Sequence, residues 1–271
     1  MLELPELDHV RGALTNRFAG ASITGIEVTS SKTFQVNVDE WRKDIVGAVV
    51  WFIERRGKHL LFHLDNGKRL IFQLTQTAYL YIGSEDDAPD KAAQVQIKFG
   101  ERVVYAVGLR SESIKLLSVR EVEELFSVLG ADPLDKKLTL NRFIDRFAKK
   151  RSSIRQALLD TSILNAIGSA YADEILFRAG LLPDAKIPLL EKETWERLFE
   201  AMHNVLQEAI SSGGAGDNPF AADDQLTGGY ISKFKVYNRE GEPCPTCGAA
   251  ILKLEQSGRK AYYCGTCQKD K

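Results

Sequence analysis

Four cysteines near the end of the chain constrain its fold more than any other feature. They form two C-x-x-C pairs separated by sixteen residues, at Cys244, Cys247, Cys264 and Cys267. Each pair is typical of a tight knuckle that directs two thiolates at one ion, so the spacing predicts a four-cysteine zinc site. Disulfides are disfavoured because the chain begins without a secretion signal. A redox pair is disfavoured because such a motif lies beside a strand–helix unit.

The residues between the two cysteine pairs are typical of a β-hairpin. Arg259 and Lys260 follow the turn, where they either reach phosphates or remain two exposed charges on a loop. A ribbon this short cannot build its own hydrophobic core, so we expect one structural zinc ion to supply its folding energy. The turn is expected at Ser257-Gly258, between the strand-forming residues Ile251, Leu254, Tyr262 and Tyr263.

The length and composition of the chain limit its class and location. With 271 residues and 44% hydrophobic content, the chain can build more than one core. No stretch approaches the roughly 20 apolar residues of a membrane span, so we expect no membrane partner. The start, Met1-Leu2-Glu3-Leu4, lacks the basic residues and the apolar run of a secretory signal. We therefore expect a cytoplasmic protein, associated with the nucleoid if it is bacterial.

The first part of the chain is predicted to contain a helix and then short strands. Residues Glu6–Phe18 have helical spacing of apolar side chains. Asn66-Gly67 is a strong signal for a tight hairpin. Short runs without intervening helices favour an antiparallel β-sandwich. The expected strands are Ile23–Thr29, Ile45–Arg55, His59–Leu64, Arg69–Leu74, Ala78–Ile82, Val95–Phe99 and Arg102–Val107.

Helical patterns replace the strands near Val119. Gly180 is expected to end the fourth helix as its C-cap, and the segment 213–229 is predicted to be a mobile loop. The predicted fold class is α+β and multidomain: a β-sandwich at 1–118, a helical domain at 119–229 and a zinc ribbon at 230–271. The expected helices are Arg120–Leu129, Thr139–Lys150, Ser153–Leu159, Ser169–Ala179 and Lys192–Ser212.

The charge of the chain is small but unevenly distributed. A formal net charge of −1 argues against a simple electrostatic nucleic-acid binder, because such domains are usually basic. The segment Asn141–Arg155, however, carries six basic residues against a single acid, Asp145. Segregation of this kind allows a basic face on a neutral protein, although a solvated helix surface gives the same pattern.

The histidines and tryptophans have structural interpretations. The four histidines show no metal-ligand spacing with one another. His63 alternates with apolar neighbours on an expected strand, which favours a packing role. Trp41, Trp51 and Trp195 are expected to anchor the core rather than to stack on bases.

Three separated motifs resemble the formamidopyrimidine-DNA glycosylase and endonuclease VIII family. They are Glu3-Leu4-Pro5-Glu6, the segment 166–174 (AIGSAYADE), and the terminal segments 237–244 (YNREGEPC) and 258–264 (GRKAYYC). The resemblance implies an N-terminal β-sandwich, a helix–two-turns–helix domain and a zinc finger. It also implies a partner, damaged or abasic double-stranded DNA. Such enzymes flip the damaged base out of the duplex, cleave its glycosidic bond and cut the strand by β-elimination. Nothing in the sequence indicates oligomers, so we expect a monomer.

Matching positions suggest roles for individual residues. Glu3 matches the family's catalytic carboxylate and Glu6 its companion acid, although both residue types also favour a helix start. Lys58 matches a lysine that contacts DNA near the active site, and Arg259 matches the zinc-finger arginine that grips phosphates. Ser169 stands where the family usually has a phosphate-binding asparagine, at the start of a helix that can still bind phosphate.

The N-terminus departs from the family pattern. The family's nucleophile is a proline directly after the initiator methionine, and Leu2 occupies that position. Methionine removal generally requires a small second residue, so we expect Met1 to remain. Its primary amine is then displaced by one residue, about 3.8 Å between Cα atoms. The amine is reactive in its neutral form, and Lys58 is an alternative nucleophile if its environment lowers its pKa.

The residues that fill the gap left by a flipped nucleotide also differ. Gln76 stands at the family's methionine position. Leu109 stands for its arginine, and Ser111 for its aromatic wedge. Leu109 and Arg110 are the remaining candidates to probe the duplex.

Two hypotheses about activity therefore remain open. The first is an active DNA glycosylase and abasic-site lyase with an atypical N-terminus, supported by Glu3, Glu6, Lys58 and Arg259. The second is a catalytically silent binder of damaged or abasic DNA, motivated by Leu2 and the altered loops. A zinc-ribbon module for protein contacts is a third and weaker interpretation.

Overall fold

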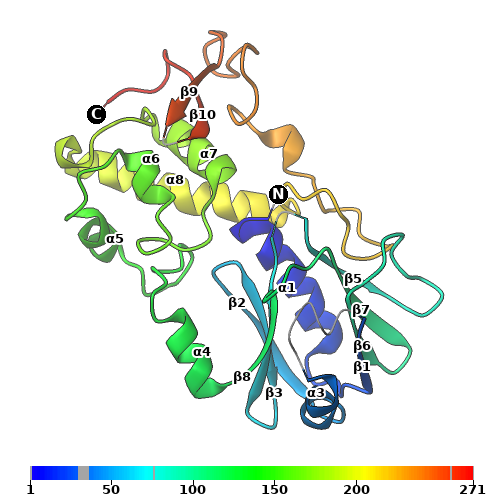
Figure 1. Ribbon diagram of the computed structural model, residues 1–271. Coiled ribbons are helices and arrows are strands. Elements are labelled where there is room, and N and C mark those ends of the chain that lie inside the picture. The colour runs from blue at the N-terminus through cyan, green and yellow to red at the C-terminus, as the bar shows by residue number, and fades with distance from the viewer. Residues whose placement is uncertain (1, 30–36, 76, 257, 271) are drawn as a thin grey trace. The chain divides into compact units, whose positions relative to one another are not determined.

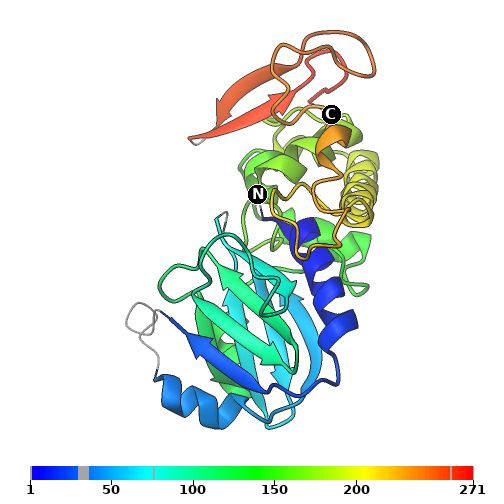
Figure 2. The same ribbon diagram turned by 90° about the vertical axis from the view of Figure 1, so that its right-hand side faces the viewer.

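The computed structural model describes residues 2–29, 37–75, 77–256 and 258–270. They form two compact units, which appear in Figures 1 and 2. The first unit comprises Met1–Ser127 and Ile210–Gly229, and the second comprises Val128–Ala209 and Tyr230–Lys271. Among the described residues, no helix has both the length and the apolar character needed to cross a membrane.

Two antiparallel four-stranded sheets form most of the first unit and face each other in Figure 2. One sheet has the strand order β2-β3-β4-β8 and the other β1-β6-β7-β5. Side chains alternate across each strand, so both sheets contribute an apolar face to one shared core, which includes Phe62, Phe72, Ile97 and Val104. The strands are β1 (Gly25–Val28), β2 (Val50–Arg56), β3 (His59–Leu64), β4 (Lys68–Gln73), β5 (Tyr79–Gly83), β6 (Val95–Phe99), β7 (Arg102–Val107) and β8 (Ile114–Ser118).

Several helices of the first unit pack against this sandwich. Helix α1 (Leu4–Phe18) contacts β2 and β3, and it buries Leu7, Leu14 and Phe18 at helical spacing. Helix α4 (Val119–Phe126) follows β8 and contacts β4 and β8. The sandwich thus supports the start of α1, which carries two of the predicted site residues.

Two details of the predicted sandwich are wrong. Ile45 does not begin a strand, because it ends helix α3 (Val38–Ile45), whose start is capped by the Asn37 side chain accepting two backbone amides. A helix therefore does intervene between the first two strands. Trp51 does not anchor the core: its side chain is 59% exposed, beside the register shift between β2 and β3.

Helices dominate the second unit. They are α5 (Leu140–Phe147), α6 (Ile154–Leu158), α7 (Ser169–Ala179) and α8 (Lys192–Ser211), with short 3-10 turns at Ile187–Leu189 and Ile231–Lys233. The rings of Phe143, Phe147 and Trp195 pack together in its core. Gly180 ends α7 in the left-handed conformation with φ +70°, as predicted for a C-cap. The hairpin β9 (Leu252–Gln256) and β10 (Arg259–Tyr263) packs against α7 through β10.

Candidate functional site

The four cysteine thiols converge in the second unit. Their Sγ atoms all lie within 4.8 Å of one another. The separations are 3.8 Å between Cys244 and Cys267 and 3.5 Å between Cys247 and Cys264. A tetrahedral zinc ion with Zn–S bonds of about 2.3 Å requires sulfur atoms roughly 3.8 Å apart. The cysteines therefore fit one zinc ion with four protein ligands and no open coordination position, which is a structural site.

Local backbone bonds shape both cysteine knuckles. In the first, the Thr246 amide donates to Cys244 Sγ at 3.5 Å, and Gly248 closes the turn with φ +76°, a conformation that favours glycine. In the second, the Cys264 amide donates to Gln268 Oε1 at 2.8 Å. The Gln268 side chain also donates to the carbonyl of Leu181, just beyond α7, at 2.6 Å. The buried Gln268 therefore fixes the metal site to the helical part of the unit.

A buried ion pair lies where the zinc ribbon meets the helices. Arg155 Nε on α6 donates to Asp173 Oδ1 on α7 at 2.6 Å, and the two side chains are 1% and 0% exposed. Burial raises the pKa of the Asp173 carboxyl to about 6, and the Arg155 guanidinium opposes that rise. Sequence reasoning missed this pair. The sequence feature that could have indicated it is Asp173, an acidic residue near the largely apolar start of the predicted helix Ser169–Ala179.

The neighbouring acid, Glu174, fixes the segment that leads into the ribbon. Its carboxylate accepts the backbone amides of Lys235, Val236 and Tyr237 at distances of 2.8 to 3.1 Å. Burial raises the pKa of the Glu174 carboxyl, and the three amides oppose that rise. The chain therefore enters the metal site along a path held by one carboxylate.

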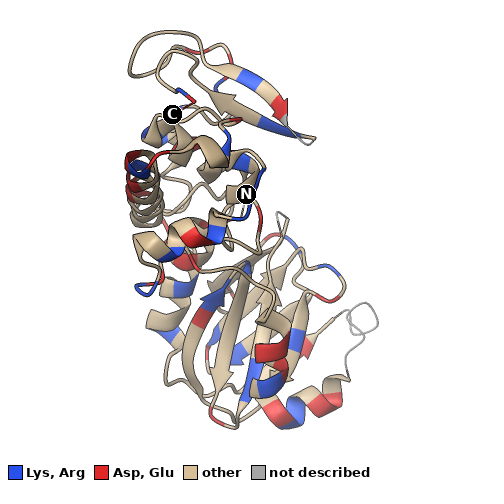
Figure 3. Ribbon diagram, turned by 90° about the vertical axis from the view of Figure 1, so that its left-hand side faces the viewer, with Lys and Arg blue, Asp and Glu red and all other residues tan. Residues whose placement is uncertain are grey.

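The predicted DNA contacts of this unit lie at the surface of the ribbon and at a helix start. Arg259 and Lys260 are exposed at the beginning of β10. Figure 3 shows Lys and Arg on both strands of the hairpin, with an acidic residue among them. Ser169 is the first residue of α7, and Gly168 is its N-cap. Ser169 is half-buried.

The first unit holds the predicted catalytic acids at the start of α1. Glu3 is the N-cap and forms a capping box with Glu6, in which the Glu3 amide donates to Glu6 Oε2 at 2.8 Å. Glu6 Oε1 accepts the Ala215 amide at 2.7 Å. Both acids are 3% exposed. Gly214 makes this approach possible, because a Cβ atom there would lie 2.6 Å from Glu6 Oε1.

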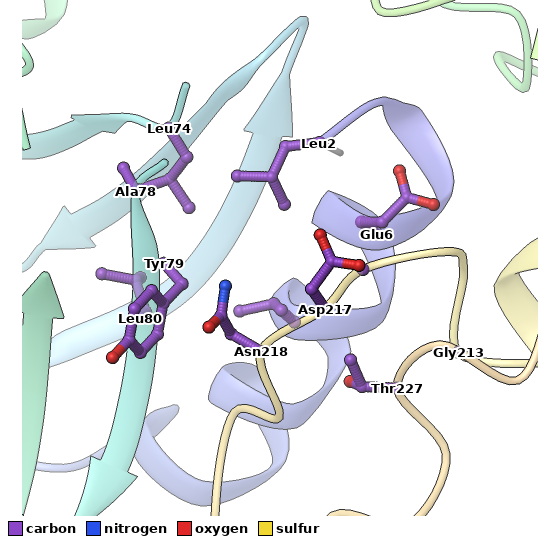
Figure 4. Close-up of a pocket in the computed structure, with 12 residues that line it drawn as sticks. Leu2, Glu6, Leu74, Ala78, Tyr79, Leu80, Gly213, Asp217, Asn218 and Thr227 are labelled. Atoms are coloured by element: carbon purple, nitrogen blue, oxygen red, sulfur yellow. The ribbon is translucent and has the colours of Figure 1, made fainter. Parts of the chain in front are cut away.

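A small cavity of about 30 Å³ opens beside Glu6. Leu2 lines it and packs against the hydrophobic core, as Figure 4 shows. Leu74 lies across the cavity, and Asp217 and Asn218 line it from the segment 210–229. Sequence reasoning had not identified Asp217 or Asn218.

Lys58 lies close to this cavity through its backbone. It follows Gly57 in the turn between β2 and β3, and its carbonyl accepts the amide of Leu74 at 3.3 Å. Leu74 itself lines the cavity. The structure thus brings Leu2, Glu6 and the Lys58 backbone into one region of the first unit.

The loop after β7 separates the two residues predicted to probe a duplex. Leu109 is 6% exposed and belongs to the hydrophobic core, so the interpretation of Leu109 as a probe is wrong. Arg110 is exposed, and its amide and carbonyl are bonded to Ser113. Met1 and Gln76, the other predicted residues at this centre, lie outside the described residues.

Comparison with known families finds three matches along the chain. Residues 1–112 match the N-terminal domain of formamidopyrimidine-DNA glycosylase, and residues 129–220 match the H2TH domain of the same family. Residues 241–269 match a zinc finger found in FPG and IleRS. The chain is 33% identical to the formamidopyrimidine-DNA glycosylase of Pelotomaculum thermopropionicum over 276 residues, which cover all of both chains. It is 31% identical to that of Desulfitobacterium hafniense over 273 residues, 99% of this chain and 100% of the relative.

Similar solved structures agree with these matches. A complex of Lactococcus lactis Fpg with DNA containing an abasic site has a TM-score of 0.87 and 27% identity, over 98% of this chain and 99% of that one. A mutant of the same protein bound to DNA containing Fapy-dG gives the same values. With the observed sheets and the cysteine cluster, these matches confirm the predicted fold class: a β-sandwich, an H2TH helical domain and a four-cysteine zinc finger.

Proposed function

Because this chain belongs to the formamidopyrimidine-DNA glycosylase family, we propose that it is a base-excision DNA repair protein. It binds double-stranded DNA that contains a damaged base or an abasic site, and it releases the damaged base as a DNA glycosylase. The observation that carries this proposal is the full-length match to relatives of that name, together with the TM-score of 0.87 to Fpg–DNA complexes.

Zinc is structural in this function. The ion holds the ribbon through Cys244, Cys247, Cys264 and Cys267 and takes no part in the chemistry, because four thiolates leave no position for a water or a substrate. The ribbon carries the exposed Arg259, which we assign to the DNA phosphates. The exposed Arg110 and the half-buried Ser169 and Lys58 are further proposed DNA contacts. Arginine suits the ribbon position, since its planar fork matches phosphate oxygens.

The chemistry is proposed at the start of the chain. The Met1 amine forms a bond to the sugar carbon that bears the base, while the glycosidic bond from that carbon to the base breaks and the base leaves. The amine loses a proton and the departing base gains one, and Glu3 carries these proton transfers. Lys58 is the alternative amine. The structure supports a positioning part for Glu6, because both of its oxygens accept backbone amides and thereby fix the start of α1 beside the segment 210–229.

The domain division supports a distribution of these tasks. We propose that residues 1–118 carry the catalytic centre and that residues 119–229, including the loop 213–229, form the H2TH domain. Two segments of that proposed domain, 119–127 and 210–229, pack in the first compact unit with the proposed catalytic centre. Residues 230–271 then form the zinc finger. We further propose that the protein acts as a monomer in the cytoplasm, at the nucleoid, since its relatives are bacterial. Light scattering of the purified protein with and without a duplex tests the monomer.

One experiment tests both binding and chemistry. The protein is incubated with three duplexes of the same sequence, which carry an abasic site, an oxidised purine or no damage, and borohydride is added. We expect tighter binding to both damaged duplexes and a trapped adduct whose mass maps to Met1. Equal affinity for all three duplexes would contradict the proposal. Selective binding of damaged duplexes without an adduct or base release would contradict the proposed catalytic activity. The protein would then be a binder of damaged DNA without catalysis.

A further inference from the structure

The buried pair Arg155 and Asp173 contacts more than its own two helices. Arg155 Nη2 donates to the carbonyl of Lys260 at 2.6 Å, and Asp173 Oδ2 accepts the amide of Tyr262 at 2.9 Å. The two side chains therefore bond strand β10 as well as each other. Residue 173 is 89 positions from Tyr262 in the chain, so this contact is purely tertiary.

The two bonds fall on the edge of β10 that its partner strand does not use. Within the part of the chain that the structure describes, the ribbon sheet has two strands, β10 and β9. Backbone groups of residues two apart point to the same side of a strand, so the Lys260 carbonyl and the Tyr262 amide share one edge. Arg155 supplies a donor and Asp173 an acceptor to that edge, as a third strand would. A lone two-stranded hairpin is marginally stable in water, so this edge pairing stabilises the ribbon where it leaves the helices.

The position of the pair relates it to the proposed DNA contact. Along β10, Arg259 and Lys260 are exposed and Ala261 and Tyr262 are buried. The bonds of Arg155 and Asp173 to β10 thus lie at the boundary between the exposed start of the strand and its buried part. Arg259 is the residue directly before the bonded Lys260 carbonyl. Fixing that carbonyl fixes the direction in which the Arg259 side chain leaves the strand.

A fully buried ion pair needs a reason beyond stability. Apolar side chains of similar volume at such positions are often as stable or more so, because both charges lose their hydration. The guanidinium fork, in contrast, can bond a carboxylate and a carbonyl at once in fixed directions, which neither an apolar group nor a lysine does. The geometry is therefore better suited to orienting a strand than to stabilising a core.

We propose that Arg155 and Asp173 are positioning residues that hold β10 so that Arg259 meets a DNA phosphate. This proposal rests on the proposed function, because it assumes that Arg259 contacts DNA. It assigns a role in binding to a pair that is fully buried and lies outside the cysteine cluster.

The test is a mutant cycle with the uncharged pair Arg155→Met and Asp173→Leu, chosen because removing both charges leaves neither one unpaired. In this variant we expect one zinc ion per chain, as in the wild-type protein. We also expect hydrogen exchange at the Tyr262 amide to be at least tenfold faster than in the wild-type protein. Affinity for an abasic-site duplex should fall on the order of tenfold, and the slope of log affinity against log salt should fall by about one, as for Arg259→Ala. Adding Arg259→Ala to the uncharged pair should cause no further loss.

Two control variants keep the cycle decisive. Arg178→Gln with Glu208→Gln removes an exposed ion pair of the same unit, 3.1 Å long, and should change neither exchange nor binding. Arg155→Lys keeps the charge opposite Asp173 but loses the fork, and it should give an intermediate salt slope. If the uncharged-pair variant loses zinc, Arg155→Lys serves as the test variant in its place.

The outcomes separate this proposal from the proposed function. The positioning role would be overturned if the uncharged-pair variant bound the abasic-site duplex with wild-type affinity. It would also be overturned if the affinity losses of this variant and of Arg259→Ala multiplied when combined, since a purely structural pair acts independently of Arg259. Slow exchange at the Tyr262 amide in the variant would overturn the contact itself. If the wild-type protein bound no damaged duplex, the proposed function would fail, and the exchange result would still decide whether the pair orders β10.

Discussion

The zinc ribbon of one unit depends on four thiolates within 4.8 Å, whereas the N-terminal centre of the other depends on one buried carboxylate, Glu6, between two backbone amides. The ribbon is ordered by a metal ion and two charged side chains. The N-terminal centre is ordered by apolar packing and a capping box, with Leu2 against the cavity wall. One chain thus positions its proposed DNA contact and its proposed reactive centre by separate means. Each can therefore be disrupted without the other.

Removal of one zinc ligand should produce the largest effect. In Cys247→Ser, the hydroxyl replaces a thiolate, and structural zinc sites in isolated fingers contribute roughly 10–16 kcal/mol of apparent folding energy. We expect loss of stoichiometric zinc and a fall in affinity for abasic DNA of more than about 100-fold, since the ribbon unfolds. Thr246→Ser, in the same knuckle but not a ligand, is the control for metal content and binding.

The same variant tests the independence of the two regions. Exchange of the amides in β3 and β7 of the first unit should stay at the wild-type rate in Cys247→Ser. Faster exchange throughout the sandwich would show that the two regions are energetically coupled.

Restoring the family's second residue should have the next largest effect. Leu2→Pro permits removal of Met1 and returns the amine to the position of the proline nucleophile. Because a shift of about 1 Å can cost roughly 100-fold in rate, we expect borohydride trapping to accelerate by about that factor. Leu2→Ala also permits removal of Met1 but supplies a primary amine, so it separates position from proline chemistry. Unchanged trapping in both would show that the position of the amine does not limit the reaction.

The elements that the sequence predicted well have strong local patterns. The bounds of β3, β6, β7 and α7 match the predicted ranges. Strand β6 has alternating apolar residues, β3 and β7 are short apolar runs, and Gly180 marks the end of α7. Helix α3 was missed because it is short and its signal is one capping residue, Asn37.

The two candidate sites differ in predictability for the same reason. The metal site follows from the spacing of cysteines along the chain. The partner of Glu6 is the Ala215 amide, 209 residues away, and Asp173 of the buried pair bonds the Tyr262 amide of β10, 89 residues away. No local pattern encodes such contacts, because they depend on how distant segments pack. Leu109 shows the opposite error. Its matching position in the family suggested a residue that probes DNA, but its side chain is buried in the hydrophobic core.

A methyl group at Gly214 should destabilise the N-terminal centre by a moderate amount. Gly214→Ala places Cβ 2.6 Å from Glu6 Oε1 at φ +67°, so the Glu6–Ala215 bond must lengthen. We expect a loss of about 2 kcal/mol in the free energy of unfolding, measured by denaturant titration. Gly216→Ala is the matched control, because its nearest atoms lie at 3.6 Å. Equal stability of the two variants would mean that the Glu6 contact contributes little.

The smallest effect is expected at a surface ion pair of the second unit, which contrasts with the buried pair. Lys150 Nζ lies 2.8 Å from Asp160 Oδ2, and this bond and that of Ser162 lower the Asp160 pKa to about 2. A lowered carboxyl pKa adds stability above the unfolded value of about 3.9, and that stability is lost as the pH falls toward 2. Both side chains are more than a third exposed, so Lys150→Gln should cost less than about 1 kcal/mol at pH 5 and nothing near pH 2. Because both proteins lose zinc in acid, the wild-type protein and Lys150→Gln are compared with each other at each pH. A difference in their free energies of unfolding that persisted near pH 2 would assign the effect to packing rather than charge.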